Sequence, residues 1–332
     1  MIFAWQVKII SKFSPRLRQQ AGCFFPIKPE RSVPILSRSP AFGHLLALAV
    51  SIVWGTTYIS TKVLLDAFHP VEILIFRFVL AWAILFLCAP KPHLPRSFRS
   101  ELPFLGAALS GLTFYYLLEN YALTFSMAST VGLIVSSAPM FTALLLWLCR
   151  RTTRPGASFF VGFVLAMAGI ALISLAEGES FDFNPIGCLL ALGSAISWGV
   201  YGLCLESAQR QGLNDLLVTR KVFFWGVLFT LPFCLGTGIT FDLTRFAQPV
   251  MLGNTVYLGV VASALCFLAW NQASALIGPV ATNVYLYLMP VITVAASFLI
   301  LGEPVTLFTL GAIVLILAGL WLSQRRSTIL TT

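Results

Sequence analysis

The sequence predicts an all-α integral membrane protein with about ten transmembrane helices, arranged as two inverted five-helix repeats. Three observations lead to this prediction: the composition, a series of apolar runs and an internal repeat. Of the 332 residues, 58% are hydrophobic and only 10% are charged, whereas soluble domains carry about 25% charged residues. The chain therefore has too few polar residues to cover the surface of a soluble core.

The apolar runs have the length of membrane-spanning helices, which need roughly 20 mostly apolar residues. Barrel strands would be about 10 residues long and would alternate apolar with polar positions. Only helices satisfy so much backbone within lipid. Pro, Gly and short charged clusters separate ten such runs, near residues 43–62, 72–89, 103–124, 129–148, 158–176, 187–205, 216–235, 252–272, 280–301 and 306–322.

Lys and Arg gather in four of the segments that flank these runs. These four segments are the first 40 residues, the connections near 91–99 and 150–154, and the tail after residue 324. With ten spans all four lie on one side, which the positive-inside rule assigns to the cytoplasm. We therefore expect a multi-pass protein of a cell membrane (in bacteria, the inner membrane) with both termini cytoplasmic. The net charge of +9 is dispersed over these loops, so we predict the lipid bilayer and no nucleic acid as a partner.

No sequence pattern indicates a cofactor, a metal site or catalytic residues. The seven cysteines form no CxxC pair, the three histidines are scattered, and no GxxxxGK[ST] loop occurs. We therefore predict no cofactor, no metal and no enzyme activity. The chain also lacks a strict GxxxG motif, so no dimer is predicted and the oligomeric state stays open.

The second half of the chain repeats the first. Residues 45–55 (LLALAVSIVWG) and 189–199 (LLALGSAISWG) share seven of eleven positions. Later in each half, Arg77 matches Arg220, Asn120 matches Asn271 and Pro139 matches Pro290. Five spans are an odd number of crossings, so the second half is inverted relative to the first, as in many secondary transporters.

The repeat defines the domain organisation that we expect. Each repeat contains five helices, and a basic stretch flanks the pair at either end. The predicted parts are a partly disordered cytoplasmic tail at 1–41, a first repeat at 42–177, a second repeat at 178–323 and a short cytoplasmic tail at 324–332.

Three stretches carry a resemblance to a known family: VWGTTYISTKVLLDAFHPVEILIFRF, ALTFSMASTVGLIVSSAPMFTALL and LILGEPVTLFTLGAIVLILAGLWL. They resemble the EamA-type permeases of the drug/metabolite transporter superfamily over residues 42–322. The resemblance implies ten helices, cytoplasmic termini and efflux of small metabolites such as amino acids or toxic analogues across the plasma membrane. One departure stands out: the first half has LCRRTTRP (148–155) where the second has LGEPVT (301–306), so only one half has an acidic residue in this turn.

Two opposite charges are expected to meet inside the membrane. Glu119 is predicted roughly 8 Å from the outer end of the third span and Arg77 roughly 9 Å deep in the second, at about 1.5 Å per residue. Such charges usually face a partner or a wet cavity. The pair is either a structural ion pair or part of the substrate pathway. Trp270 occupies the position of Glu119 in the second half, and Arg220 with Lys221 is expected to reach lipid phosphates.

Further pathway candidates come from the repeated motifs. Trp54, Tyr58, Trp198 and Tyr201 either line the pathway as aromatic walls or simply pack. Asn120 and Asn271 either line it or bond across helices, which contributes about 0.6 kcal/mol each.

The repeated prolines, Pro139 and Pro290, are expected to kink the fourth and ninth spans and to act as hinges, unless they are merely tolerated there.

We expect a secondary transporter that moves a small-molecule substrate, with protons as a possible coupling ion. The alternatives are a membrane-embedded enzyme and a receptor or scaffold without transport activity. An enzyme would need His, Asp or Glu clustered at one membrane face, and a scaffold would usually display a sizeable domain outside the membrane. The sequence offers neither.

Overall fold

A computed structural model of the chain describes residues 39–90, 97–149, 156–180, 185–237, 239, 241–277, 282–283 and 285–324. Helices make up most of the described residues, and seven of them are long and apolar enough to cross a membrane. Three shorter apolar helices complete ten, at Ala157–Gly169, Tyr285–Leu301 and Leu307–Leu322. These match the ten predicted runs. The N-terminal tail before residue 39 and the basic cluster at 150–154 lie outside the described residues.

The first five spans comprise eight elements. They are α3 (Pro40–Leu65), α4 (Pro70–Cys88), α5 (Phe98–Ala107), η2 (Ala108–Phe114), α6 (Tyr115–Phe125), α7 (Ala128–Val135), α8 (Ala138–Leu148) and α9 (Ala157–Ser180).

The second five spans comprise ten elements, which include a 3₁₀ turn, η3, in a connection and a 3₁₀ turn, η5, and a π turn, η6, in the ninth span. They are α10 (Pro185–Gln209), α11 (Asp215–Gly236), η3 (Leu243–Ala247), α12 (Pro249–Val256), η4 (Tyr257–Leu265), α13 (Cys266–Ile277), η5 (Tyr285–Leu288), α15 (Met289–Ala296), η6 (Ser297–Leu301) and α16 (Leu307–Gln324).

Local sequence signals explain where several of these helices begin and end. The α4 helix starts at a capping box, in which the side chain of Glu72 accepts a hydrogen bond from the backbone N–H of His69 (2.8 Å). The side chain of Asn214 caps α11 by accepting from the N–H of Leu216 at 3.1 Å. The ninth span stops at Gly302, whose φ of +68° favours glycine.

The third and eighth spans each contain a π-helical turn at the same place in the repeat. They are η2 in the third span and η4 in the eighth. Such turns leave carbonyl groups without their usual helical partner, and other groups must satisfy them inside a membrane. Ser197 donates to the carbonyl of Ser110 (2.8 Å), and the indole N–H of Trp54 donates to that of Ala262 (2.9 Å). Each turn is thus bonded to the opposite repeat.

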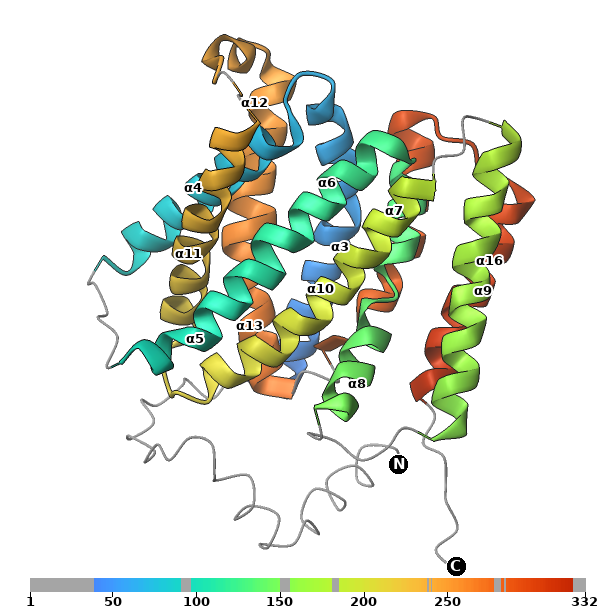
Figure 1. Cartoon of the computed structure of the whole chain (residues 1–332), viewed down its shortest axis with the longest axis horizontal. Helices are drawn as coiled ribbons and strands as arrows, with labels where there is room; N and C mark the ends of the chain where they lie inside the picture. Colours follow the sequence, from blue (N-terminus) through green and yellow to red (C-terminus); the bar gives the residue numbers. More distant parts are fainter. Residues whose placement is uncertain are drawn as a thin grey trace, which may run out of the picture. The chain divides into compact units, whose positions relative to one another are not determined.

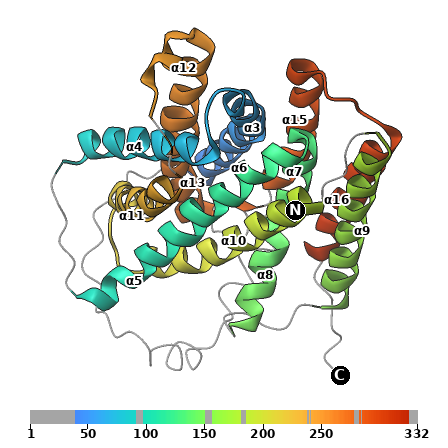
Figure 2. The same cartoon turned by 45° about the horizontal axis from the view of Figure 1, so that its top comes forward.

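The contacts between helices follow the symmetry of the repeats: a contact that a helix of one repeat makes with the other repeat recurs for its counterpart. The α3 helix packs against α13 and α15 of the second repeat, and its counterpart α10 packs against α6 and α8 of the first. Likewise α4 contacts η4, and its counterpart α11 contacts η2. The last spans of the two repeats, α9 and α16, lie side by side (Figure 1 and Figure 2). The two halves therefore form interlocked repeats, as the sequence predicts.

Candidate functional site

A cavity lies between the two repeats. Its walls come from the first, third and fourth spans of the first repeat and from the sixth and ninth spans in the second. Four candidates from the sequence line it: Trp54, Tyr58, Glu119 and Trp198. The other lining residues are Thr57, Tyr115, Tyr116, Val135, Ser136, Ala138, Leu286 and Met289.

Two residues that line the cavity have buried oxygen atoms without a hydrogen-bond partner among the described residues. They are the carboxylate atom Oε1 of Glu119 and the hydroxyl of Tyr58. Glu119 and Tyr58 are each 1% exposed. Burying a polar group without a partner is unfavourable, so a ligand group or water that bonded these oxygens would be stabilised in the cavity.

Aromatic rings form much of the wall. The rings of Trp54 and Trp198, one from each repeat, meet edge to face with their centroids 5.5 Å apart. Tyr115 lies 5.1 Å from Trp198 and 4.7 Å from Tyr116 by the same measure. Because Tyr115 and Glu119 are four residues apart on α6, they share one helix face. The carboxylate is therefore surrounded by aromatic surface.

The repeated Trp-Gly pairs explain how the first and sixth spans build this wall. Each Trp lines the cavity, and the glycine after it admits a helix of the opposite repeat. A Cβ atom on Gly55 would lie 2.7 Å from Cγ2 of Ile292, and one on Gly199 would lie 3.1 Å from the backbone N of Thr142. Small residues permit such close helix contacts.

Arg77 lies beside the cavity and does not line it. Its Nε donates to the hydroxyl of Ser263 (2.6 Å), its Nη2 donates to that of Tyr116 (3.0 Å), and its guanidinium lies 4.0 Å from the Tyr116 ring centroid. Arg77 and Glu119, both described, make no direct ion pair. The expected charge pair is thus replaced by an Arg77–Tyr116 contact, with Tyr116 between the arginine and the cavity.

The remaining pathway candidates support the site from outside. The amide of Asn120 donates to the carbonyl of Pro70 (3.0 Å), and that of Asn271 donates to the hydroxyl of Thr219 (2.7 Å). Both amides thus tie the third or eighth span to the helix before it. Tyr201 packs on Gly111, where a Cβ atom would lie 2.1 Å from its ring. Its own ring lies 4.8 Å from that of Trp198.

Both repeated prolines stand where a span is broken. Pro139 is in the first turn of α8, after α7 has ended and Ser136 and Ser137 have made a turn. Pro290 is in the first turn of α15, after the 3₁₀ turn η5. Proline is well tolerated at a helix start, where no intrahelical N–H bond is lost. The fourth span therefore consists of two helices, and Ser136 at their junction lines the cavity.

Glu303 is a site residue whose role sequence reasoning missed. Its carboxylate accepts hydrogen bonds from the N–H groups of Ala128 (2.8 Å) and Ser129 (3.0 Å), and from the Ser129 hydroxyl (2.6 Å). A negative charge at a helix N-terminus is stabilising. An acidic residue from the second repeat thus caps α7 of the first. The LGEP motif had marked the residue, but its sequence contains no information on the partner.

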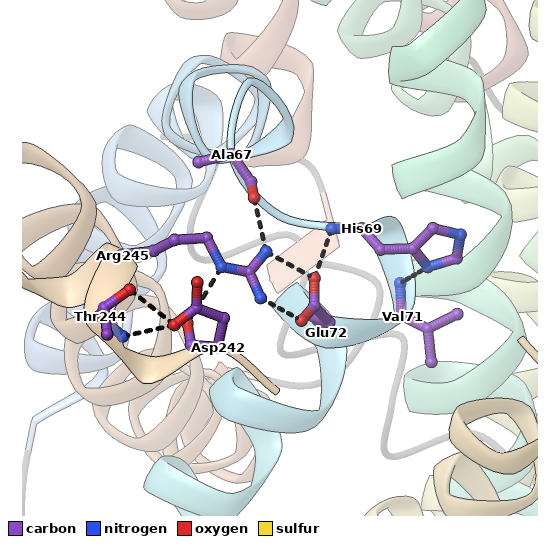
Figure 3. Close-up of polar contacts among 7 residues, drawn as sticks. All are labelled: Ala67, His69, Val71, Glu72, Asp242, Thr244 and Arg245. Atoms are coloured by element: carbon purple, nitrogen blue, oxygen red, sulfur yellow. Dashed lines mark hydrogen bonds and ion pairs between the residues drawn. The ribbon is translucent and has the colours of Figure 1, made fainter. Parts of the chain in front are cut away.

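A second connection between the repeats involves Glu72 and Arg245 (Figure 3). The guanidinium of Arg245 forms two contacts with the carboxylate, Nη2 to Oε1 at 2.6 Å and Nη1 to Oε2 at 3.1 Å, and donates to the carbonyl of Ala67 at 2.6 Å. The hydrogen bond to Glu72 raises the pKa of Arg245 above its ordinary value. Hydrogen bonds from Thr244 lower the pKa of Asp242. This network joins η3 to the α3–α4 connection.

The basic pair at the start of α11 differs from expectation. Lys221 forms a buried ion pair with Glu101, whose second oxygen accepts from the indole N–H of Trp225 at 3.1 Å. Arg220 donates to the carbonyl of Ala89. Both side chains are buried and bind the first repeat, where the sequence had predicted contact with lipid phosphates.

Several known proteins are similar to this chain over most of its length. One is a probable terminal-alkyne amino-acid exporter of Streptantibioticus cattleyicolor, which is 28% identical. The match covers 85% of this chain and 93% of that protein. Another is a probable amino-acid metabolite efflux pump of Salmonella typhimurium, also 28% identical. The match covers 87% of this chain and 95% of that protein. A third is an uncharacterized transporter of Archaeoglobus fulgidus, which is 28% identical. The match covers 85% of this chain and 97% of that protein.

The fold is also known from experiment. A crystal structure matches with a TM-score of 0.62 and 18% identity, covering 86% of this chain and 96% of the other. The model of the EamA-like transporter family matches the chain twice, at residues 41–175 and 185–324. Each match contains five of the spans described above. The chain therefore belongs to the EamA-like transporter family.

Proposed function

We propose that the chain exports small metabolites, such as amino acids or toxic analogues, by alternating access between its two repeats. The observation that carries the proposal is the cavity between the repeats, which Trp54 and Glu119 line from the first and Trp198 and Met289 from the second. A site built by both repeats changes its exposure when they rock against each other.

The names of two relatives support export over import. One is named a probable amino-acid exporter and the other a probable amino-acid metabolite efflux pump. Each is 28% identical to this chain. Identity at this level supports amino acids and related metabolites as the class of substrate, and it does not point to one compound. The EamA-like family is one of transporters and not of enzymes.

Proton coupling is proposed to run through Glu119. Of the described lining residues, it is the one with a carboxylic acid, which exchanges a proton far more readily than the tyrosine hydroxyls beside it. An ionised carboxylate in a dry cavity is unfavourable without a cation beside it. Protonation of the empty site and ionisation of the loaded site would therefore couple an incoming proton to outgoing substrate.

The contacts between repeats support gates that are closed on both sides of the cavity. With cytoplasmic termini, the Glu72–Arg245 pair and the Glu303 cap both lie on the outer side. The Glu101–Lys221 pair lies on the inner side. Opening on either side would require the contacts on that side to break.

An export screen followed by flux measurement tests this function. The chain is overexpressed in a sensitive host, which is challenged with toxic amino-acid and metabolite analogues. A compound that the cells newly survive is then loaded into proteoliposomes. We expect release that depends on the protein and speeds up with an opposing proton gradient. Absence of release, or formation of a covalently changed product, would contradict the proposal.

A further inference from the structure

The two unpartnered oxygens of the cavity point to the kind of chemical group that it binds. Oε1 of Glu119 and the hydroxyl of Tyr58 are both buried, and both residues line the same space. A carboxylate oxygen accepts hydrogen bonds, and a hydroxyl both accepts and donates. An ammonium group carries three donors and a positive charge. It can therefore satisfy both atoms at once and neutralise the carboxylate.

The aromatic wall favours the same charge. The faces of Trp and Tyr rings attract cations, and more strongly where water is excluded. The indole N–H of Trp54 is already bonded to the carbonyl of Ala262, so this ring offers its apolar and π surface to a ligand. Flat or apolar ligand bodies fit a wall of this kind.

The lining supplies little to hold a ligand's carboxylate. Among the described lining residues there is no Lys or Arg. The nearby Arg77 already donates to Ser263 and Tyr116. The hydroxyls of Thr57 and Ser136 donate to carbonyls of their own helices. The remaining side-chain donors of the lining, the tyrosine hydroxyls among them, are neutral, so the lining can pair the charge of a cation and has no positive charge to pair with a carboxylate.

We propose that the cavity recognises the ammonium group of an amine with an aromatic or apolar body, and that Glu119 and Tyr58 hold this group. The proposal rests on the proposed transport function and narrows its substrate class: the amine is required, and a carboxylate beside it is not.

Three probes with one ring system test the proposal by binding alone. Tryptamine has the amine, tryptophan has the amine and a carboxylate, and indole-3-propionate has only the carboxylate. Calorimetry on the full chain in lipid nanodiscs measures all three. We expect tryptamine to bind at least as tightly as tryptophan, and indole-3-propionate not to bind. Tighter binding of tryptophan or indole-3-propionate would overturn the proposal. Binding of none of the probes would overturn it too, because the oxygens would then hold water only.

Variants locate the site. Glu119→Gln should weaken tryptamine binding by about ten- to a hundredfold, because the amide still accepts a hydrogen bond but no longer carries the charge that pairs with the ammonium group. Tyr58→Phe, which removes one oxygen, should weaken it several-fold and serves if the first variant fails to fold. Glu206→Gln removes a carboxylate that pairs with Arg210 at 2.5 Å on α10 and should leave binding unchanged. Unchanged binding in both cavity variants would contradict the assignment.

The experiment separates this inference from the proposed function. If tryptamine binds as expected while no compound is transported, the amine site stands and the transport proposal fails. If export of some compound is demonstrated while tryptamine does not bind, transport stands and the amine site fails.

Discussion

Glu119 is the residue on which the site depends most. A charge inside a bilayer is costly, by about 2.5–3.5 kcal/mol at the centre and less toward the interface on insertion scales, and this carboxylate has an oxygen without a partner among the described residues. Arg77 does not offset that cost by a direct bond, since its donors go to Ser263 and Tyr116. An acid kept in such a place is best explained by a ligand or proton that it binds.

The first prediction concerns this carboxylate. Glu119→Gln should leave protein abundance near normal, because Glu119 forms no ion pair with any residue that the structure describes. Transport, or its dependence on pH, should be abolished, because glutamine cannot take up and release a proton. The measurements are membrane abundance and proteoliposome flux across a pH series.

The exchange of charges is the matched test. The double variant Glu119→Arg with Arg77→Glu should not restore transport, because the carboxylate then lies outside the cavity lining. Restoration of both abundance and activity would indicate a purely structural pair. An abundant, fully active Glu119→Gln protein with an unchanged pH profile would contradict the functional role.

At the scale of elements, the broken fourth and ninth spans are the features most suited to movement. The break after α7 places Ser136 at the cavity, and Thr293 of α15 donates to the carbonyl of Gly55 at 2.8 Å. A turn between two short helices changes its backbone angles more readily than a continuous helix does.

The second prediction therefore concerns the prolines at these breaks. Pro139→Ala and Pro290→Ala should fold, because each proline occupies a helix start where alanine fits. Both should slow transport, since alanine lets the helix extend through the break. Flux is measured at equal protein abundance, and wild-type rates in both variants would mean that the prolines are only tolerated.

The third prediction concerns the cap on α7. Glu303→Ala should destabilise the protein by about 0.5–2 kcal/mol, the usual cost of losing a helix cap. Ser129→Ala removes one of the three hydrogen bonds to the carboxylate and should cost less. Thermal unfolding in detergent measures both variants, and equal stability of Glu303→Ala and the wild type would show that the cap is dispensable.

The sequence predicted the spans of this fold better than their interiors. Apolar length and Lys/Arg flanks locate a helix, but they carry no signal for the π turns η2 and η4. The same limit applies to contacts over long separations. Glu303 and Ser129 are 174 residues apart, so their pairing depends on how the repeats interlock. Glu119 was found by its charge in an apolar run, whereas Arg77, chosen by the same signal, turned out to bond elsewhere.

At the scale of the whole molecule, approximate symmetry coexists with a few asymmetric residues. Helix contacts exchange between repeats, and Trp54 and Trp198 meet in the cavity. Yet Trp270 replaces Glu119 in the second repeat, and its ring packs 4.9 Å from that of Trp54. In the proposed mechanism, the symmetric part allows two related conformations, and the asymmetric carboxylate binds the proton or ligand on one side.

The fourth prediction concerns orientation in the membrane. Reporter fusions at residues 35 and 324 should both report the cytoplasm, because Lys and Arg flank the spans on that side. A fusion at Ser180 should report the outside. A C-terminus outside the cell would contradict ten spans with cytoplasmic ends.

The most direct test of the central claim, that the cavity between the repeats opens to each side in turn, is the accessibility of one cysteine. Ser136→Cys is placed in a chain whose seven native cysteines are replaced by serine, and a membrane-impermeant maleimide is added to vesicles of either orientation. Exposed Ser97→Cys is the control and should react from the cytoplasmic side alone. We predict that the cavity cysteine of an active protein reacts from both sides. Reaction from one side only, or from neither, would contradict alternating access through this cavity.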